Sequence, residues 1–128
     1  MTIRRITSGS EFEARIGYSR AVIVDGWVFV SGTTGFDYTS MTIEDDIVAQ
    51  TRQCLSNIEI ALAEAGAGFS EVVRVRYVAP DAIEFESVWP LLQAAFGAAA
   101  PAAMMISAGL ADERMKIEIE VTARLPAG

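Results

Sequence analysis

The sequence of 128 residues contains no histidine, one cysteine and one lysine. Without histidine, the chain lacks the commonest general base, the commonest metal ligand and every Ser-His or Cys-His nucleophile pair. Cys54 has no second cysteine with which to form an intrachain disulfide, and its place near the apolar stripe of a predicted helix favours an inert buried thiol. Any catalysis must therefore use carboxylates, arginine, tyrosine, hydroxyls, backbone groups or water.

Basic residues are also few, with 10 Lys and Arg against 17 Asp and Glu and a net charge of −7. Nucleic-acid binding depends on clustered basic side chains, and the sequence shows no such cluster. No apolar run approaches the ~20 residues that span a bilayer, and the N-terminus has no signal-peptide pattern. We therefore expect a single domain over residues 1–128, cytoplasmic, with neither a membrane nor a nucleic-acid partner.

Hydrophobic residues make up 52% of the chain, and their spacing predicts both strands and helices. Residues 20–32 form two β-rich runs around Asp25-Gly26, a dipeptide that favours a tight hairpin turn. Further strands are predicted at about 71–79, 103–108 and 115–124, and the last has the cleanest alternation of apolar and polar residues.

Two helices are predicted between these strands. The first begins after Thr42, whose hydroxyl can cap it, and ends at Gly66. The second has its regular part beginning near Glu86 or Ser87, because Pro90 is tolerated only in the first turn of a helix.

This order of elements predicts an α+β fold in which two helices cover one face of a mixed sheet. The second face would carry Arg74, Arg76, Glu118, Glu120 and part of the apolar hairpin. Because soluble monomers rarely expose large apolar patches, we favour burial of this face against other subunits. A solvated polar face with scattered apolar residues stays open as the alternative.

Several short segments, in their order along the chain, are similar to one known family. They are Gly17-Tyr18-Ser19, Phe29-Val30-Ser31-Gly32, Phe85 and Phe96, Pro101-Ala102, and Lys116-Ile117-Glu118-Ile119-Glu120. Together they resemble the YjgF/RidA (Rid) family over nearly the whole chain. The twenty residues from Pro101 to Glu120 match the closing segment of that family without a gap.

The resemblance implies the chorismate-mutase-like α+β fold and a homotrimer whose sheets form a central barrel, with clefts between adjacent subunits. Well-studied members are imine/enamine deaminases, which hydrolyse reactive 2-imino acids to 2-keto acids and ammonia without a metal or an organic cofactor. The family has also been described as ribonucleases or translation inhibitors, which the acidic charge of this chain does not favour.

The sequence departs from the deaminase pattern at the position that holds the substrate. In that branch an arginine directly after the Pro-Ala step grips the substrate carboxylate, and here the position is Ala103. Loss of such a charge-assisted pair removes about 1.5–3 kcal/mol of interaction. Trp89 also stands where the pattern has an asparagine. The chain thus resembles an arginine-less branch, with a less anionic or more apolar ligand; Arg20 or another arginine is a candidate substitute for the missing charge.

The resemblance also implies the remaining site residues. Glu118 matches a glutamate near the cleft water, where it is a candidate general base; the alternative is an ion pair on an ordinary strand. Tyr18 matches a cleft-lining tyrosine, the alternative being a loop aromatic that packs on the core. Ser31 and Gly32 lie at a strand end where backbone can approach a ligand. Ser107 is a further candidate for a residue that faces the cleft.

Two functions follow from these observations and stay open. The first is a trimeric hydrolase of imine, enamine or related carbonyl metabolites that binds its small-molecule ligand in an intersubunit cleft. The second is a non-catalytic ligand-binding or interaction protein on the same fold, for which Ala103 is the reason.

Overall fold

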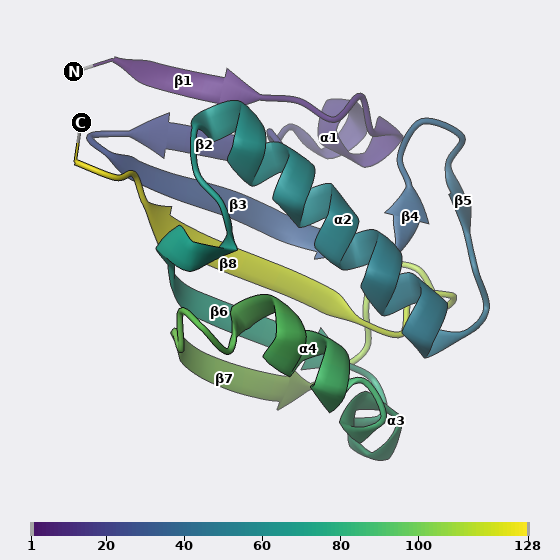
Figure 1. The fold of residues 1–128 in the computed structure, drawn as a ribbon. Coiled ribbons are helices and arrows are strands. Elements are labelled where there is room, and N and C mark those ends of the chain that lie inside the picture. Colours follow the sequence, from purple (N-terminus) through teal and green to yellow (C-terminus); the bar gives the residue numbers. More distant parts are fainter. Residues whose placement is uncertain (1, 128) are drawn as a thin grey trace.

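A computed structural model describes residues 2–127 of the chain, whose main feature is a six-stranded sheet (Figure 1). The strand order is β1-β2-β3-β8-β6-β7. Neighbouring strands are antiparallel except β6 and β7, which are parallel, so the prediction of a mixed sheet is confirmed. The strands are β1 (Ile3–Ile6), β2 (Ala21–Val24), β3 (Trp27–Thr34), β6 (Val72–Ala79), β7 (Ala102–Ser107) and β8 (Glu118–Arg124).

The remaining elements are helices and one small ribbon. The helices are α1 (Glu11–Ile16), α2 (Ile47–Ala65), the 3-10 helix η1 (Phe69–Glu71), α3 (Ala82–Glu86) and α4 (Trp89–Phe96). The ribbon pairs β4 (Phe36–Asp37) with β5 (Thr42–Ile43). No helix within residues 2–127 is long and apolar enough to cross a bilayer.

The hairpin of β2 and β3 is confirmed at the predicted turn. Asp25 and Gly26 adopt φ angles of 54° and 81°, the positive values that a tight hairpin turn requires. Val24 and Trp27 lie directly opposite each other on the two sides of this turn. The turn therefore fixes which residues of β3 face the helices.

Helices α2 and α4 lie on the same face of the sheet (Figure 1). Helix α2 buries Cys54, Ile58 and Leu62 completely, in a core that includes Val28 and Val30 of β3. Two helices over one face were expected from the sequence, and the helical spacing of these apolar residues explains why α2 settles there.

The predicted start of α2 is wrong. Thr42 belongs to β5, where it pairs with Asp37 of β4. Asp46 caps the helix instead, by accepting a hydrogen bond of 3.2 Å from the Ala49 N–H. Threonine and aspartate are both good capping residues. Asp46 rather than Thr42 caps α2, because Thr42 is already paired in a strand. The predicted end is confirmed, since Gly66 adopts the left-handed cap conformation with φ of 91°.

The second predicted helix is divided into α3 and α4. Asp81 caps α3, and α4 begins at Trp89 with Pro90 in its first turn, so the expected start at Glu86 or Ser87 is wrong. The proline ring would clash with the carbonyl four residues earlier, and Pro90 has no N–H with which to continue α3. The chain therefore ends one helix and begins another.

The other face of the sheet carries no helix from α2 or α4, as expected. It combines ionic and apolar side chains. Arg76 and Glu120 form an exposed ion pair at 2.6 Å on this face. The exposed large apolar side chains of β3 and β7 include Trp27 (39%), Phe29 (46%), Met104 (44%) and Ile106 (42%).

Candidate functional site

Four of the predicted site residues line one cavity. Tyr18, Ser31, Gly32 and Glu118 surround a volume of about 410 Å³, which we call the Glu118 cavity. Glu118 is the first residue of β8, and Ser31 and Gly32 lie on the adjacent β3. Residues separated by almost 90 positions in the sequence therefore meet because β3 and β8 are neighbours.

A local irregularity in β3 shapes the floor of this cavity. The register between β3 and β8 shifts between Val30 and Thr33, so Ser31 and Gly32 form a bulge. The Ser31 hydroxyl donates a hydrogen bond of 2.6 Å to the Ser19 carbonyl, which ties the bulge to the segment that carries Tyr18. The bulge thereby fixes the backbone beside Glu118.

Gly32 leaves room for the Glu118 carboxyl group in its observed position. A Cβ atom at position 32 would lie 2.8 Å from Glu118 Cδ and 3.0 Å from its Oε1. Burial raises the pKa of Glu118 above its usual range, the positive charge of Arg20 opposes this shift and the negative charge of Glu120 adds to it. A carboxyl group in such a position is suited to accepting and returning a proton.

Arg20 lies in the interior next to the Glu118 cavity. Its guanidinium forms an ion pair of 3.2 Å with Glu13, and the two side chains are only 2% and 4% exposed. It also donates hydrogen bonds to the Gly32 carbonyl at 2.9 Å and to the Thr33 hydroxyl at 3.0 Å. Its Cζ atom lies 4.3 Å from the Tyr38 ring centroid. These internal contacts engage the Nε and Nη1 atoms of Arg20, which does not line the Glu118 cavity, and its role as a substitute for the missing ligand-binding charge stays a prediction.

Glu13 is held as an anion in this network. Burial by itself raises the pKa of the Glu13 carboxyl, but hydrogen bonds from Ser8 and Thr7 and the charge of Arg20 together lower it below its usual value. The Thr7 hydroxyl donates at 2.8 Å, and the Ser8 hydroxyl also donates to this carboxylate. The pair is thus an internal support for the bulge at Gly32.

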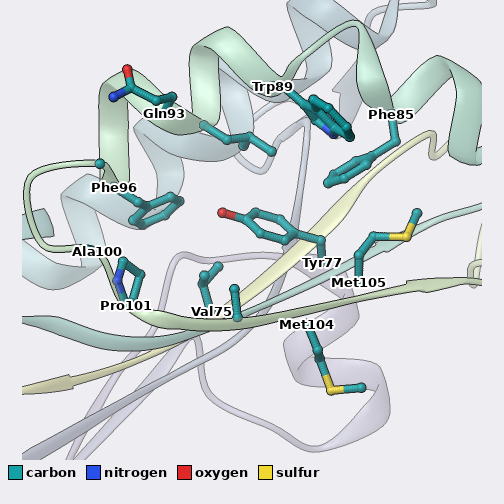
Figure 2. A pocket seen from close by; sticks show the side chains of 13 residues that line it. Val75, Tyr77, Phe85, Trp89, Gln93, Phe96, Ala100, Pro101, Met104 and Met105 are labelled. Atoms are coloured by element: carbon teal, nitrogen blue, oxygen red, sulfur yellow. The ribbon is translucent and has the colours of Figure 1, made fainter.

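A second cavity, of about 490 Å³, contains Ala103 (Figure 2). We call it the Ala103 cavity. It lies between β6, β7 and the helices α3 and α4. Its thirteen lining residues carry no charged side chain and include Tyr77, Phe85, Trp89, Phe96, Met104 and Met105.

The two cavities share no lining residue, and the sheet explains why. Ala103 lies opposite Val75, which is buried under the helices, so Ala103 points to the helix side of β7. Glu118 precedes Ile119, which is completely buried, so its side chain points to the other face. The predicted site residues are therefore divided between two faces of one chain.

Ser107 belongs to neither cavity. It lies at the end of β7, is exposed, and its hydroxyl donates a hydrogen bond of 3.2 Å to the Pro80 carbonyl. The Ser107 hydroxyl thus contacts the residue that follows β6, and the structure does not bring Ser107 to the cavity of Glu118 or to that of Ala103.

Comparison with known proteins decides the family. A family model described as endoribonuclease L-PSP matches residues 8–125. The chain belongs to the YjgF/RidA family. It is 32% identical to a goat (Capra hircus) 2-iminobutanoate/2-iminopropanoate deaminase over 123 residues, covering 94% of this chain and 90% of that protein. The human deaminase of the same name is 30% identical over 123 residues, with the same coverage of both chains.

Solved structures of the YjgF/RidA family have the same fold. The crystal structure of Rv2704 from Mycobacterium tuberculosis, a member of this family, superposes with a TM-score of 0.87 and 40% identity, covering 97% of this chain and 100% of the other. The expected α+β fold of the family is thereby confirmed.

Two features of this YjgF/RidA chain escaped sequence reasoning. The Glu13–Arg20 pair joins helix α1 to the residue that precedes β2 and follows no period that a sequence pattern reveals. Tyr77, Phe85 and Phe96 have the spacing of ordinary core residues, but they form the wall of the Ala103 cavity. Only the absence of charged residues from the segments 89–93 and 101–106 could have indicated a neutral cavity.

Proposed function

We propose that this chain hydrolyses neutral imines, enamines or related carbonyl compounds at clefts between the subunits of a homotrimer. The observation that carries this proposal is the Glu118 carboxyl with its raised pKa, packed against Gly32 beside Tyr18 and Ser31. The deaminase names of relatives at about 30% identity support the reaction class.

The proposed cleft uses both cavities. Glu118 and Ala103 point to opposite faces of the sheet, so one small molecule cannot contact both within a single chain. A cleft between two copies can bring the Glu118 cavity of one subunit to the Ala103 cavity of the next. The exposed apolar residues of β3 and β7 support association of the sheet faces.

In the proposed reaction, the Glu118 carboxylate accepts a proton from water while the water oxygen attacks the carbon of the C=N bond. The protonated Glu118 then returns the proton to the nitrogen. As the tetrahedral intermediate collapses, its hydroxyl proton passes through Glu118 to the same nitrogen, the C–N bond breaks, and a carbonyl product and ammonia leave. The Tyr18 ring forms a wall of the cavity, and the Ser31 to Gly32 backbone positions the carboxyl group. The oxidation state of the substrate carbon does not change, so the reaction consumes only water.

The direct test is Glu118→Gln, with Glu59→Gln on the exposed side of α2 as the matched control. Ammonia release from freshly generated imines should be lost in the first variant and kept in the second. Light scattering should give a trimer of the 13.8 kDa chain for both proteins. Equal rates for Glu118→Gln and the unmodified protein would contradict the hydrolase mechanism.

A binding protein without catalysis is the second candidate, and the uncharged lining around Ala103 favours it. Ala103→Arg separates the two functions, because it restores the charge that the family resemblance places there. Acquired hydrolysis of 2-imino acids would show that Glu118 and its surroundings are competent. An inert variant that still forms trimers would favour binding alone.

A further inference from the structure

The Ala103 cavity has the properties of a binding site for an uncharged molecule. Its volume of about 490 Å³ is large enough for a small metabolite with an aromatic ring. None of the thirteen lining residues is Asp, Glu, Lys or Arg. A carboxylate or phosphate bound against these side chains would gain no cationic partner from them, so any loss of its hydration would go uncompensated.

The walls of the cavity are aromatic and sulfur-containing. The Tyr77 ring lies 5.4 Å from the ring of Phe85 and 6.4 Å from that of Phe96, both in inclined orientations (Figure 2). Met105 lies on the helix side of β7 next to Tyr77, and Trp89 lies beside Phe85 (Figure 2). Tilted rings and a flexible thioether offer favourable contacts to another ring or to a branched aliphatic group.

Two neutral polar groups accompany these walls. Figure 2 shows the Tyr77 hydroxyl directed toward Phe96, with Gln93 on the helix above. Both side chains line the cavity, and neither is among the buried polar groups without a partner within residues 2–127, because Gln93 is exposed and Tyr77 is only partly buried. Burial raises the pKa of Tyr77 to about 12, so its hydroxyl stays protonated and uncharged. An uncharged carbonyl, imine or amine group of a ligand can replace water as the hydrogen-bond partner of these two groups.

We propose that the Ala103 cavity selects uncharged imines, enamines or carbonyl compounds that carry an aromatic or branched aliphatic group, and that it discriminates against their carboxylate counterparts. This inference rests on the proposed function for one point, that the reacting group is an imine, enamine or carbonyl. The preference for an uncharged ligand with an apolar group rests on the lining of the cavity alone. The apolar group fills the space between Tyr77, Phe85 and Phe96. The side facing the Glu118 cavity of the neighbouring subunit receives the reacting carbon.

The test compares two ketones that differ in one group. Benzylacetone has a methyl group where the corresponding keto acid has a carboxylate, and neither ketone is consumed by hydrolysis. Calorimetry on the full-length protein should show benzylacetone binding at least about tenfold more tightly than the keto acid, a difference in line with the loss of one charge-assisted pair. Tyr77→Phe should weaken benzylacetone binding by about two- to tenfold through loss of one hydrogen bond.

Two more variants complete this test. Ala103→Arg should reverse the preference in favour of the keto acid. Ile83→Ala, at an 83% exposed position outside the cavity lining, should leave both affinities unchanged. Equal or tighter binding of the keto acid to the unmodified protein would overturn the inference. Failure of both ketones to bind at millimolar concentration would also overturn it, and would indicate that a second copy of the chain covers the cavity.

A kinetic comparison separates this inference from the proposed function. Amine oxidation of phenethylamine yields a neutral imine, and amino-acid oxidation of phenylalanine yields the same skeleton with a carboxylate. Faster hydrolysis of the neutral imine supports both proposals. Faster hydrolysis of the imino acid overturns the inference and leaves the hydrolase function standing. Selective benzylacetone binding without hydrolysis of either imine overturns the hydrolase function and supports the inference.

Discussion

Replacement of Arg20 by methionine tests whether the buried Glu13–Arg20 pair supports the site. Methionine keeps much of the apolar stem of arginine but removes the charge and every N–H donor. Glu13 would remain 4% exposed without its cation, and the Gly32 carbonyl and the Thr33 hydroxyl would each lose a donor. Breaking a buried ion pair from one side costs about 3–5 kcal/mol.

The assay is urea unfolding at neutral pH, followed by thermal unfolding. For a chain of this size, the expected loss lowers the midpoint temperature by roughly 10–20 °C. The matched control is Arg76→Met, because Arg76 forms an ion pair with Glu120 whose side chains are 48% and 42% exposed. An exposed pair contributes about 0–1 kcal/mol, so this variant should stay close to the unmodified protein.

The double variant Glu13→Gln with Arg20→Met sharpens the test. If the cost of Arg20→Met arises from an uncompensated buried carboxylate, neutralising Glu13 should recover part of the lost stability. The reasoning is refuted if Arg20→Met destabilises the protein no more than Arg76→Met does. It is also refuted if the double variant is as unstable as the sum of the two single variants.

Two further predictions concern the same region. Gly32→Ala should displace the Glu118 carboxyl and lower turnover, since the new Cβ would lie 2.8 Å from Glu118 Cδ. Gly109→Ala is the control and should leave turnover unchanged, because a Cβ at position 109 meets nothing within 4 Å. Equal rates for the two variants would contradict the packing argument. Because the pKa of Glu13 is lower in the folded state than in the unfolded chain, its stabilisation is complete above the unfolded value of about 4.3 and is lost as pH falls through the folded value. Glu13→Gln should therefore flatten the acid limb of a stability profile measured by urea unfolding from neutral pH downward, and an unchanged limb would contradict the role of this carboxylate.

Features that depend on local sequence could be predicted. The hairpin follows from the Asp25-Gly26 turn, and the end of α2 follows from Gly66, because each needs a backbone conformation that few residues adopt. Strand β8 follows from its alternation of apolar and polar residues. The sequence also predicts that one face of the sheet has no helical layer, because it contains only two long helical patterns and these can cover only one face.

Features that depend on contacts between distant segments could not be predicted. The short strand β1 and helix α1 lack a clear period and were absent from the predicted order of elements, since they form by pairing with β2 and by local capping. The interior position of Arg20 depends on Glu13 from α1, which sequence reasoning did not place. Alternation along β8 predicts that Glu118 faces away from the helices, but the position of Ala103 opposite Val75 depends on the register of β6 and β7, which no residue pattern in this chain specifies.

This division leads to a quantitative prediction for mixed assemblies. Glu118→Gln disables one side of the proposed cleft, and Ala103→Trp fills the cavity on the other side. Each homogeneous variant should be inactive while remaining a folded trimer. In an equal mixture that is unfolded and refolded together, a cleft is intact only when an unmodified Glu118 meets an unmodified Ala103 from the neighbouring subunit.

Random assembly makes each of these two events one-half probable, so about a quarter of the clefts should be intact and the mixture should recover about a quarter of the unmodified activity. The measurement is ammonia release per mole of chain before and after co-refolding. Mixing without refolding serves as the control, because subunits that do not exchange form no intact cleft. If refolded mixtures stayed inactive, the Glu118 and Ala103 sides of the site would have to lie in the same chain, against the geometry of the sheet that separates them.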